Sequence, residues 1–132
     1  MKVLLSIKPE FANKIFEGTK KFEFRKSIFK NKNVKTVIVY ASSPVQQVIG
    51  EFEIEKILNF DLKTLWNLTH DFSGISEDFF YEYFADKDLG YAIKIKKAIK
   101  YNKPKNLREE FNLFPPQSFA YLPSERELQE VL

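Results

Sequence analysis

Two segments with the pattern of β-strands follow each other closely in the middle of the chain. Residues 36–41 are mostly β-branched or aromatic without polar alternation, as in a strand that is covered on both faces. In residues 48–57, apolar positions such as Phe52 and Ile54 alternate with glutamates. Parallel strands need a connection of about a dozen residues or more. The six residues between these segments therefore predict an antiparallel pair.

Other strand segments surround this pair. They are expected at residues 3–7, 21–26, 91–101 and, as an extended stretch, 118–122. In the second of these, Phe22 and Phe24 alternate with Glu23 and Arg25, which predicts a half-buried strand with one polar face. Gly50, inside the long central segment, predicts a bulge or a close backbone approach.

Capping residues mark the expected helices. Pro9 stands at a favourable first helical position and Gly18 follows the last periodic residue, which predicts a helix over residues 9–17. Asp61 and Ser76 are suitable N-caps for two further helices. A short helix near 107–113 and a last helix after the capping box Ser124-x-x-Glu127 complete the set.

Together these elements predict one domain over residues 1–132, of the α+β class. We expect a small, mainly antiparallel β-barrel decorated by helices, because several strands follow each other without a crossover helix. The composition is consistent with such a compact domain. With 44% hydrophobic and 16% aromatic residues in 132, the chain can bury a sizeable core.

The composition also excludes several kinds of site. The absence of cysteine and the single histidine exclude disulfides, thiolate ligand sets and a cysteine nucleophile, so we expect no metal and no cofactor. The apolar run at residues 3–7 is too short for a signal peptide or a membrane span, so we expect a cytoplasmic protein without a membrane partner. The formal net charge of +3 permits a polyanionic partner.

One motif stands where the first expected helix ends and the next strand begins. Gly18, Lys20, Glu23 and Arg25 form the pattern G-x-K-x-x-E-x-R. Side chains two apart on a strand leave the same face, about 7 Å apart, so Glu23 and Arg25 share one face with Lys20 near its rim. The cations Lys20, Lys21 and Arg25 can hold a phosphate while Glu23 accepts from the exocyclic amine of a base. The alternative is an exposed ion pair beside a helix C-cap.

This motif resembles the signature of the ASCH domains, a branch of the PUA-like superfamily. The resemblance continues through residues 5–9, 39–44, 49–52, 83–93 and 115–118, and it covers most of residues 1–122. It implies a PUA-like β-barrel whose cleft, near the start of the second strand, holds RNA or a nucleobase. Lys8, Ser42 and Ser43 lie in the matching stretches and are further candidate ligand-binding residues.

The segment at residues 91–101 is a second candidate site. Lys94, Lys96 and Lys100 point away from its apolar positions, and the flanking Tyr91 and Tyr101 can stack on bases. We therefore count these three lysines among the candidate nucleic-acid contacts. The alternative is a solvated strand face.

The resemblance and the charged residues favour a nucleic-acid-binding module that recognises a single-stranded or modified nucleobase, with RNA, or a nucleobase or nucleoside ligand, as the partner. The rival class is an enzyme, since some ASCH proteins hydrolyse acylated cytidines or cut RNA with the motif lysine, a threonine and a glutamate. Glu23 stands where that threonine would be. A catalytic pair of Lys20 and Glu23 requires burial to lower the pKa of the lysine. An adaptor without a ligand is the third class.

Overall fold

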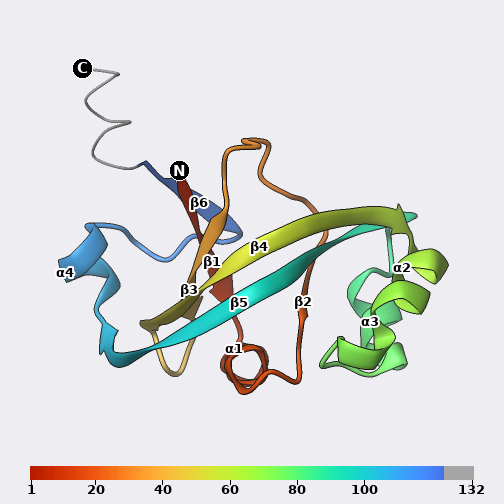
Figure 1. The fold of residues 1–132 in the computed structure, drawn as a ribbon, viewed down its shortest axis with the longest axis horizontal. Helices are drawn as coiled ribbons and strands as arrows, with labels where there is room; N and C mark the ends of the chain where they lie inside the picture. Colours follow the sequence, from red (N-terminus) through yellow and green to blue (C-terminus); the bar gives the residue numbers. More distant parts are fainter. Residues whose placement is uncertain (124–132) are drawn as a thin grey trace.

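The structure, a computed structural model, describes residues 1–123, which form six strands, four α-helices and one 3-10 turn (Figure 1). The elements follow in the order β1 (Lys2–Ile7), α1 (Pro9–Glu17), β2 (Phe22–Arg25), β3 (Thr36–Ala41), β4 (Gln47–Asp61), α2 (Leu62–Thr69), η1 (His70–Phe72), α3 (Glu77–Tyr83), β5 (Leu89–Lys105), α4 (Leu107–Phe111) and β6 (Phe119–Leu122). The helix expected after Ser124 lies outside the described residues.

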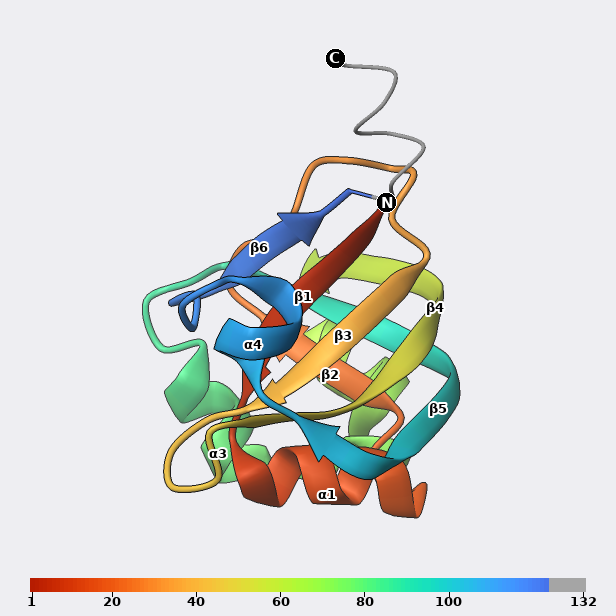
Figure 2. The same cartoon turned by 90° about the vertical axis from the view of Figure 1, so that its left-hand side faces the viewer.

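All six strands belong to one sheet in the order β2-β5-β4-β3-β1-β6. Every neighbouring pair is antiparallel except β1 and β3, which are joined through α1 and β2 and therefore have the long connection that parallel strands need. The α+β class and the mainly antiparallel sheet are confirmed. Closure into a barrel is not, because the order ends at β2 and β6, although the sheet is strongly curved (Figure 2).

β4 and β5 are the longest elements and form a twisted ribbon that crosses the whole molecule (Figure 1). They contain 15 and 17 residues and extend past both expected boundaries. Both expectations for Gly50 are confirmed. The register shifts beside it, and a Cβ there would lie 2.5 Å from Phe16 Cζ and 2.6 Å from the carbonyl oxygen of Ile99.

The local signals at helix ends are confirmed. α1 begins with Pro9 and ends at Gly18, which has a φ of 89°. The side chain of Asp61 accepts a hydrogen bond from the Thr64 amide at 3.1 Å and caps α2. Ser76 caps α3 in the same way. Among the described residues, no helix has both the length and the apolar character needed to cross a membrane.

The hydrophobic core consists of three clusters. The burial of β2 differs from the half-buried strand that the sequence predicts. The largest cluster fills the space between the curved sheet and α1, and the smallest lies under α4. The remaining one joins Phe22 and Phe24 to the helices α2 and α3. The expected half-buried β2 is wrong, because Glu23 on its other face is also buried. β2 is covered on both sides.

Candidate functional site

A cleft of about 460 Å³ opens where the ends of β1, β2 and β3 meet α1, α3 and residues 115–117. Polar and charged residues share its lining with aromatic rings and two prolines. The lining consists of Ser6, Ile7, Lys8, Phe11, Lys20, Glu23, Phe24, Arg25, Tyr40, Ser42, Ser43, Gln46, Ile75, Phe79, Tyr83, Pro115, Pro116 and Gln117.

Lys20 is held inside the cleft wall. The chain turns back after Gly18, so that the backbone amide of Lys20 donates to the carbonyl of Lys14 at 3.1 Å. Its side chain is only 2% exposed, and Nζ donates to the backbone oxygen of Ser73 at 2.6 Å. Burial lowers the pKa of Lys20 to about 8, while the charge of Glu23 acts in the opposite direction. Lys20 therefore changes protonation near pH 8, well below the range of an exposed lysine.

Glu23 is a buried carboxylate without a close partner. No hydrogen bond from the described residues reaches its carboxylate, and the nearest cation is Arg25, whose Nε lies 3.8 Å from Oε2. Burial raises the pKa of Glu23, and the charges of Arg25 and Lys20 partly oppose that change. The carboxylate retains its capacity to accept hydrogen bonds from a ligand.

Arg25 joins the cleft to two other segments of the chain. Its Nη2 donates to the backbone oxygens of Ser6 and Ser118, each at 3.2 Å. Its Nε is buried and has no hydrogen-bond partner among the described residues. A buried guanidinium N–H normally has a partner, so this group is also available to a ligand or a water molecule.

The walls of the cleft are aromatic, and these aromatic residues were not among the candidates from the sequence. Phe79 lines the cleft and packs edge-to-face on Phe11, with ring centroids 5.4 Å apart. Phe80 on α3 and Phe84 directly after it are fully buried in the core, whereas Phe79 and Tyr83 form a neighbouring stripe that faces the cleft. In the sequence, the aromatic residues 79 and 83 form one i, i+4 pair and residues 80 and 84 form another. This second pair of positions is the signal that one aromatic stripe can face the core while the other faces the cleft.

Residues from distant segments complete the walls. Tyr40 and Gln46 also line the cleft, and neither was a candidate. Pro115 and Pro116 border it because the hydroxyl of Ser6 donates to the Pro116 oxygen at 2.8 Å. Among residues 1–123 no cluster of His, Asp or Glu side chains could hold a metal ion.

The candidates from the sequence divide into two groups. The structure brings six of them into the cleft, namely Lys8, Lys20, Glu23, Arg25, Ser42 and Ser43. Gly18 is exposed at the end of α1 and does not line the cleft. Lys21 is exposed too, with Nζ 4.4 Å from the ring centroid of Phe72. The expected phosphate trio of Lys20, Lys21 and Arg25 is thus not assembled.

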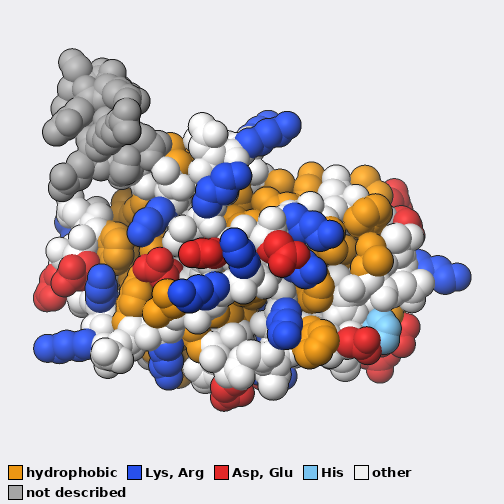
Figure 3. All heavy atoms as spheres, viewed as in Figure 1, with side chains coloured by type: hydrophobic (Ala, Val, Ile, Leu, Met, Phe, Trp, Pro, Cys, Tyr) orange, Lys and Arg blue, Asp and Glu red, His pale blue; other side chains and the backbone are white. Residues whose placement is uncertain are grey.

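The lysines of β5 lie apart from the cleft, on a face of mixed charge. Lys94 forms an ion pair with Glu55 of β4 at 2.8 Å, and Lys96 and Lys100 are exposed. Figure 3 shows carboxylates beside the lysines across this face of the molecule. The face is less basic than the sequence of β5 alone predicts, because β4 contributes its glutamates next to it.

Comparison with known proteins gives consistent results. The family model of the ASCH domain matches residues 5–105. The chain is 32% identical over 127 residues to the "ASCH domain-containing ribonuclease" of Zymomonas mobilis. This alignment covers 92% of this chain and 84% of that protein. The crystal structure of ASCH from Zymomonas mobilis has a TM-score of 0.85 at 31% identity, with 98% of this chain and 92% of that chain covered.

Two relatives from Ureaplasma parvum are much longer proteins. The large ribosomal subunit protein uL22 is 34% identical over 121 residues, and the ATP synthase subunit alpha is 37% identical over 122 residues. Each alignment covers 91% of this chain. The chain spans 39% of the length of the first relative and 15% of the second.

Proposed function

This chain belongs to the ASCH domain family, and we propose that it binds single-stranded RNA by taking one unstacked base, modified or unmodified, into the cleft. The observation that carries the proposal is the combination of Lys20, Glu23 and Arg25 with aromatic walls in one cavity of about 460 Å³. Sequence-specific RNA recognition uses bases that stack on aromatic rings and form hydrogen bonds at their edges. The ribonuclease name of the Zymomonas relative supports an RNA-related function.

Each group has a definite role in this proposal. Glu23 accepts a hydrogen bond from an exocyclic amine, and Nε of Arg25, which has no hydrogen-bond partner among the described residues, donates to a carbonyl oxygen of the same base. Phe79 and Tyr83 provide the surface on which the base stacks. Lys8, Ser42 and Ser43, at the ends of β1 and β3, contact the adjoining phosphate and sugar.

A second candidate function, RNA cleavage in the same cleft, has one observation in its favour. Burial moves the pKa of Lys20 down to about 8 and the pKa of Glu23 up, so two neighbouring groups are shifted toward neutral pH from opposite directions. Such pairs serve as general base and general acid. We place binding first, because Lys20 Nζ already donates to the Ser73 oxygen and Glu23 stands where the ASCH proteins with hydrolytic activity have a threonine.

The binding proposal is tested with a labelled single-stranded RNA of about 12 nucleotides, a length within the usual range for such sites. Phe79→Ala should weaken binding by about tenfold or more, since stacking of one base contributes about 1 to 3 kcal/mol. Phe72→Ala is the matched control, because Phe72 is 46% exposed and does not line the cleft. Equal effects of the two substitutions would contradict the proposal.

Cleavage is measured in parallel by electrophoresis of the same RNA after incubation with the protein. We expect wild-type protein to leave the RNA intact. Cleavage that disappears in Lys20→Met, with RNA binding retained, would instead establish the second function.

A further inference from the structure

A second cavity, of about 580 Å³, lies between the segment that joins β2 to β3 and the middle of β4. We call it the loop groove. Its apolar floor includes Phe29, Val34 and Ile54, and Tyr91 of β5 lies at its edge. None of the residues that line it also lines the cleft.

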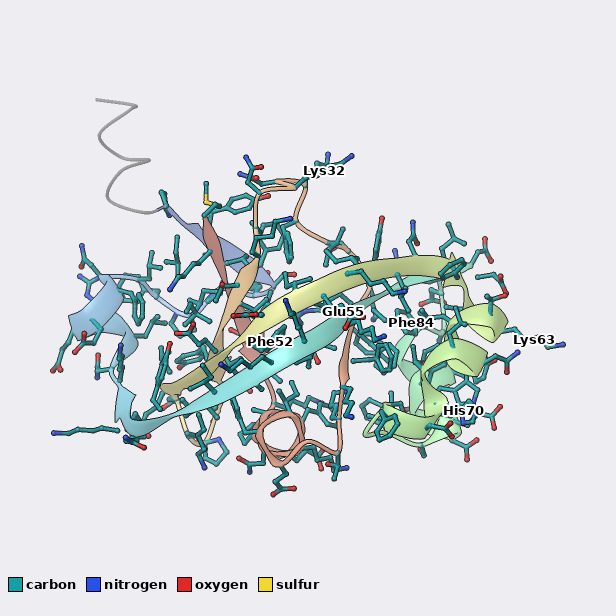
Figure 4. The ribbon with its side chains drawn as sticks, in the orientation of Figure 1. Lys32, Phe52, Glu55, Lys63, His70 and Phe84 are labelled. Carbon is teal, nitrogen blue, oxygen red and sulfur yellow. The ribbon has the colours of Figure 1, made fainter. Side chains whose placement is uncertain are left out.

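The loop groove has a strong excess of positive charge. Lys30, Lys32, Lys35 and Lys56 line it, and all four are exposed. The one carboxylate in its lining is Glu55, which is already paired with Lys94 at 2.8 Å. In Figure 4, Lys32 extends outward from the tip of the loop. Within residues 1–123 none of these four lysines forms an ion pair, and four such lysines around an apolar floor suit a polyanion with apolar parts.

The loop that carries three of these lysines is anchored to the sheet. The backbone amides of Lys30 and Asn31 donate to the hydroxyl of Tyr121 at 3.0 and 3.1 Å. Phe29 is buried, and its ring packs edge-to-face on Phe119. The loop is therefore preorganised, and a ligand does not have to order the backbone when it binds.

One pair of residues connects the loop groove with the cleft. Arg25 lines the cleft and Tyr91 lines the loop groove, and the two are register partners in the antiparallel pair of β2 and β5. The Cα atoms of such partners are about 4.5 to 5.5 Å apart. α3 also borders the cleft, and it begins with Glu77 and Asp78, which repel phosphate. A strand that leaves the cleft thus has a favourable path toward the loop groove.

We propose that the loop groove binds the sugar–phosphate backbone of the single-stranded RNA whose base occupies the cleft, with Tyr91 available for stacking. The inference rests on the proposed function, since it assigns the path of the same RNA. It predicts that long RNA contacts both cavities and that a dinucleotide contacts only the cleft.

The test compares two variants that remove the same number of charges. The groove variant carries Lys30→Gln, Lys32→Gln and Lys35→Gln. The control carries Lys63→Gln, Lys87→Gln and Lys103→Gln, three exposed lysines that line neither cavity. Figure 4 shows Lys63 on α2, well away from Lys32. Affinity for a dinucleotide and for an RNA of about 12 nucleotides is measured at several salt concentrations.

We expect the groove variant to bind the long RNA more weakly, with a salt slope smaller by about two units, because each phosphate contact to a single strand contributes about 0.7. Its affinity for the dinucleotide should equal that of the control. Equal long-RNA affinity and slope in both triple variants would overturn the inference. If the groove variant alone loses long-RNA affinity while Phe79→Ala has no effect, the loop groove binds RNA and the cleft proposal is wrong.

Discussion

The Nε atom of Arg25 lies 3.8 Å from Oε2 of Glu23, beyond hydrogen-bond distance, although this Nε atom and the Glu23 residue are both buried. Nη2 of Arg25 donates to the backbone oxygens of Ser6 and Ser118, and these two hydrogen bonds orient the guanidinium. Nε of Arg25 therefore offers a hydrogen-bond donor beside the acceptor oxygens of Glu23. The edge of a nucleobase has this complementary arrangement.

The titration of Lys20 reports directly on its coupling to Glu23. We expect a midpoint near 8 in the wild type, because burial lowers the pKa of this lysine. Glu23→Gln should move the midpoint lower, since the charge of Glu23 raises the pKa of Lys20. Glu53→Gln, at an exposed site, is the control and should leave the midpoint unchanged. NMR detection of the lysine side chain checks both, and an unchanged midpoint in Glu23→Gln would refute the coupling.

The stability of the protein should depend on pH through Glu23. Burial raises the pKa of Glu23 above its ordinary value of 4.5, so between these two values the folded protein binds more protons than the unfolded chain. The free energy of unfolding therefore falls as pH rises through that interval. Glu23→Gln should flatten this dependence and raise stability at pH 7 by about 1 kcal/mol. Urea denaturation over a pH series is the measurement, and a less stable variant with the wild-type pH dependence would contradict it.

The parts of the fold that local chemistry determines could be predicted from the sequence. Pro9, Gly18, Asp61 and Ser76 each act within one helical turn, and each marks the helix end it was expected to mark. The ends of β4 and β5 could not be predicted. Beyond Ile54, β4 is mostly exposed on both faces, so no apolar alternation marks where the strand ends.

The candidate site was predictable only in part. Alternation along β2 placed Glu23 and Arg25 on one face, and the structure brings both into the cleft. The burial of Lys20 was not predictable, because Ser73 and Gly74 cover it from a segment more than fifty residues away in the chain. Periodicity carries no information about such long-range packing. Periodicity also did not distinguish Lys21, which is exposed and does not line the cleft, from Lys20, which does.

Gly74 and Gly18 offer a matched pair of substitutions for the packing of Lys20. Both have positive φ, 70° and 89°, so alanine is strained at each and costs about 1 kcal/mol. A Cβ at Gly74 would also lie 2.7 Å from Cβ of Lys20, whereas a Cβ at Gly18 meets nothing within 4 Å. Gly74→Ala should therefore cost about 2 kcal/mol more than Gly18→Ala and shift the Lys20 midpoint. Thermal or urea denaturation measures the two losses in the free energy of unfolding, and NMR titration measures the midpoint of Lys20. Equal losses of stability in the two variants would show that Lys20 is loosely packed.

The lysines of β5 should contribute less to RNA binding than those of the loop groove. Lys94 is paired with Glu55, and carboxylates lie beside lysines across the face of β4 and β5 (Figure 3). Replacing all three by Gln should reduce the salt slope by no more than about one unit, roughly one phosphate contact. The salt dependence of RNA binding is the measurement. A reduction as large as that of the loop-groove variant would show that β5 is a principal RNA contact.

The central claim, that the cleft holds a base of single-stranded RNA, is tested most directly by an NMR titration of the isotope-labelled protein with a short single-stranded RNA. The account predicts that the largest changes in chemical shift fall on the cleft, at Lys20, Arg25, Ser42 and Phe79. Smaller changes should follow along the loop groove as the RNA is lengthened. Changes confined to the β4–β5 face, with the cleft residues unmoved at saturation, would contradict the claim.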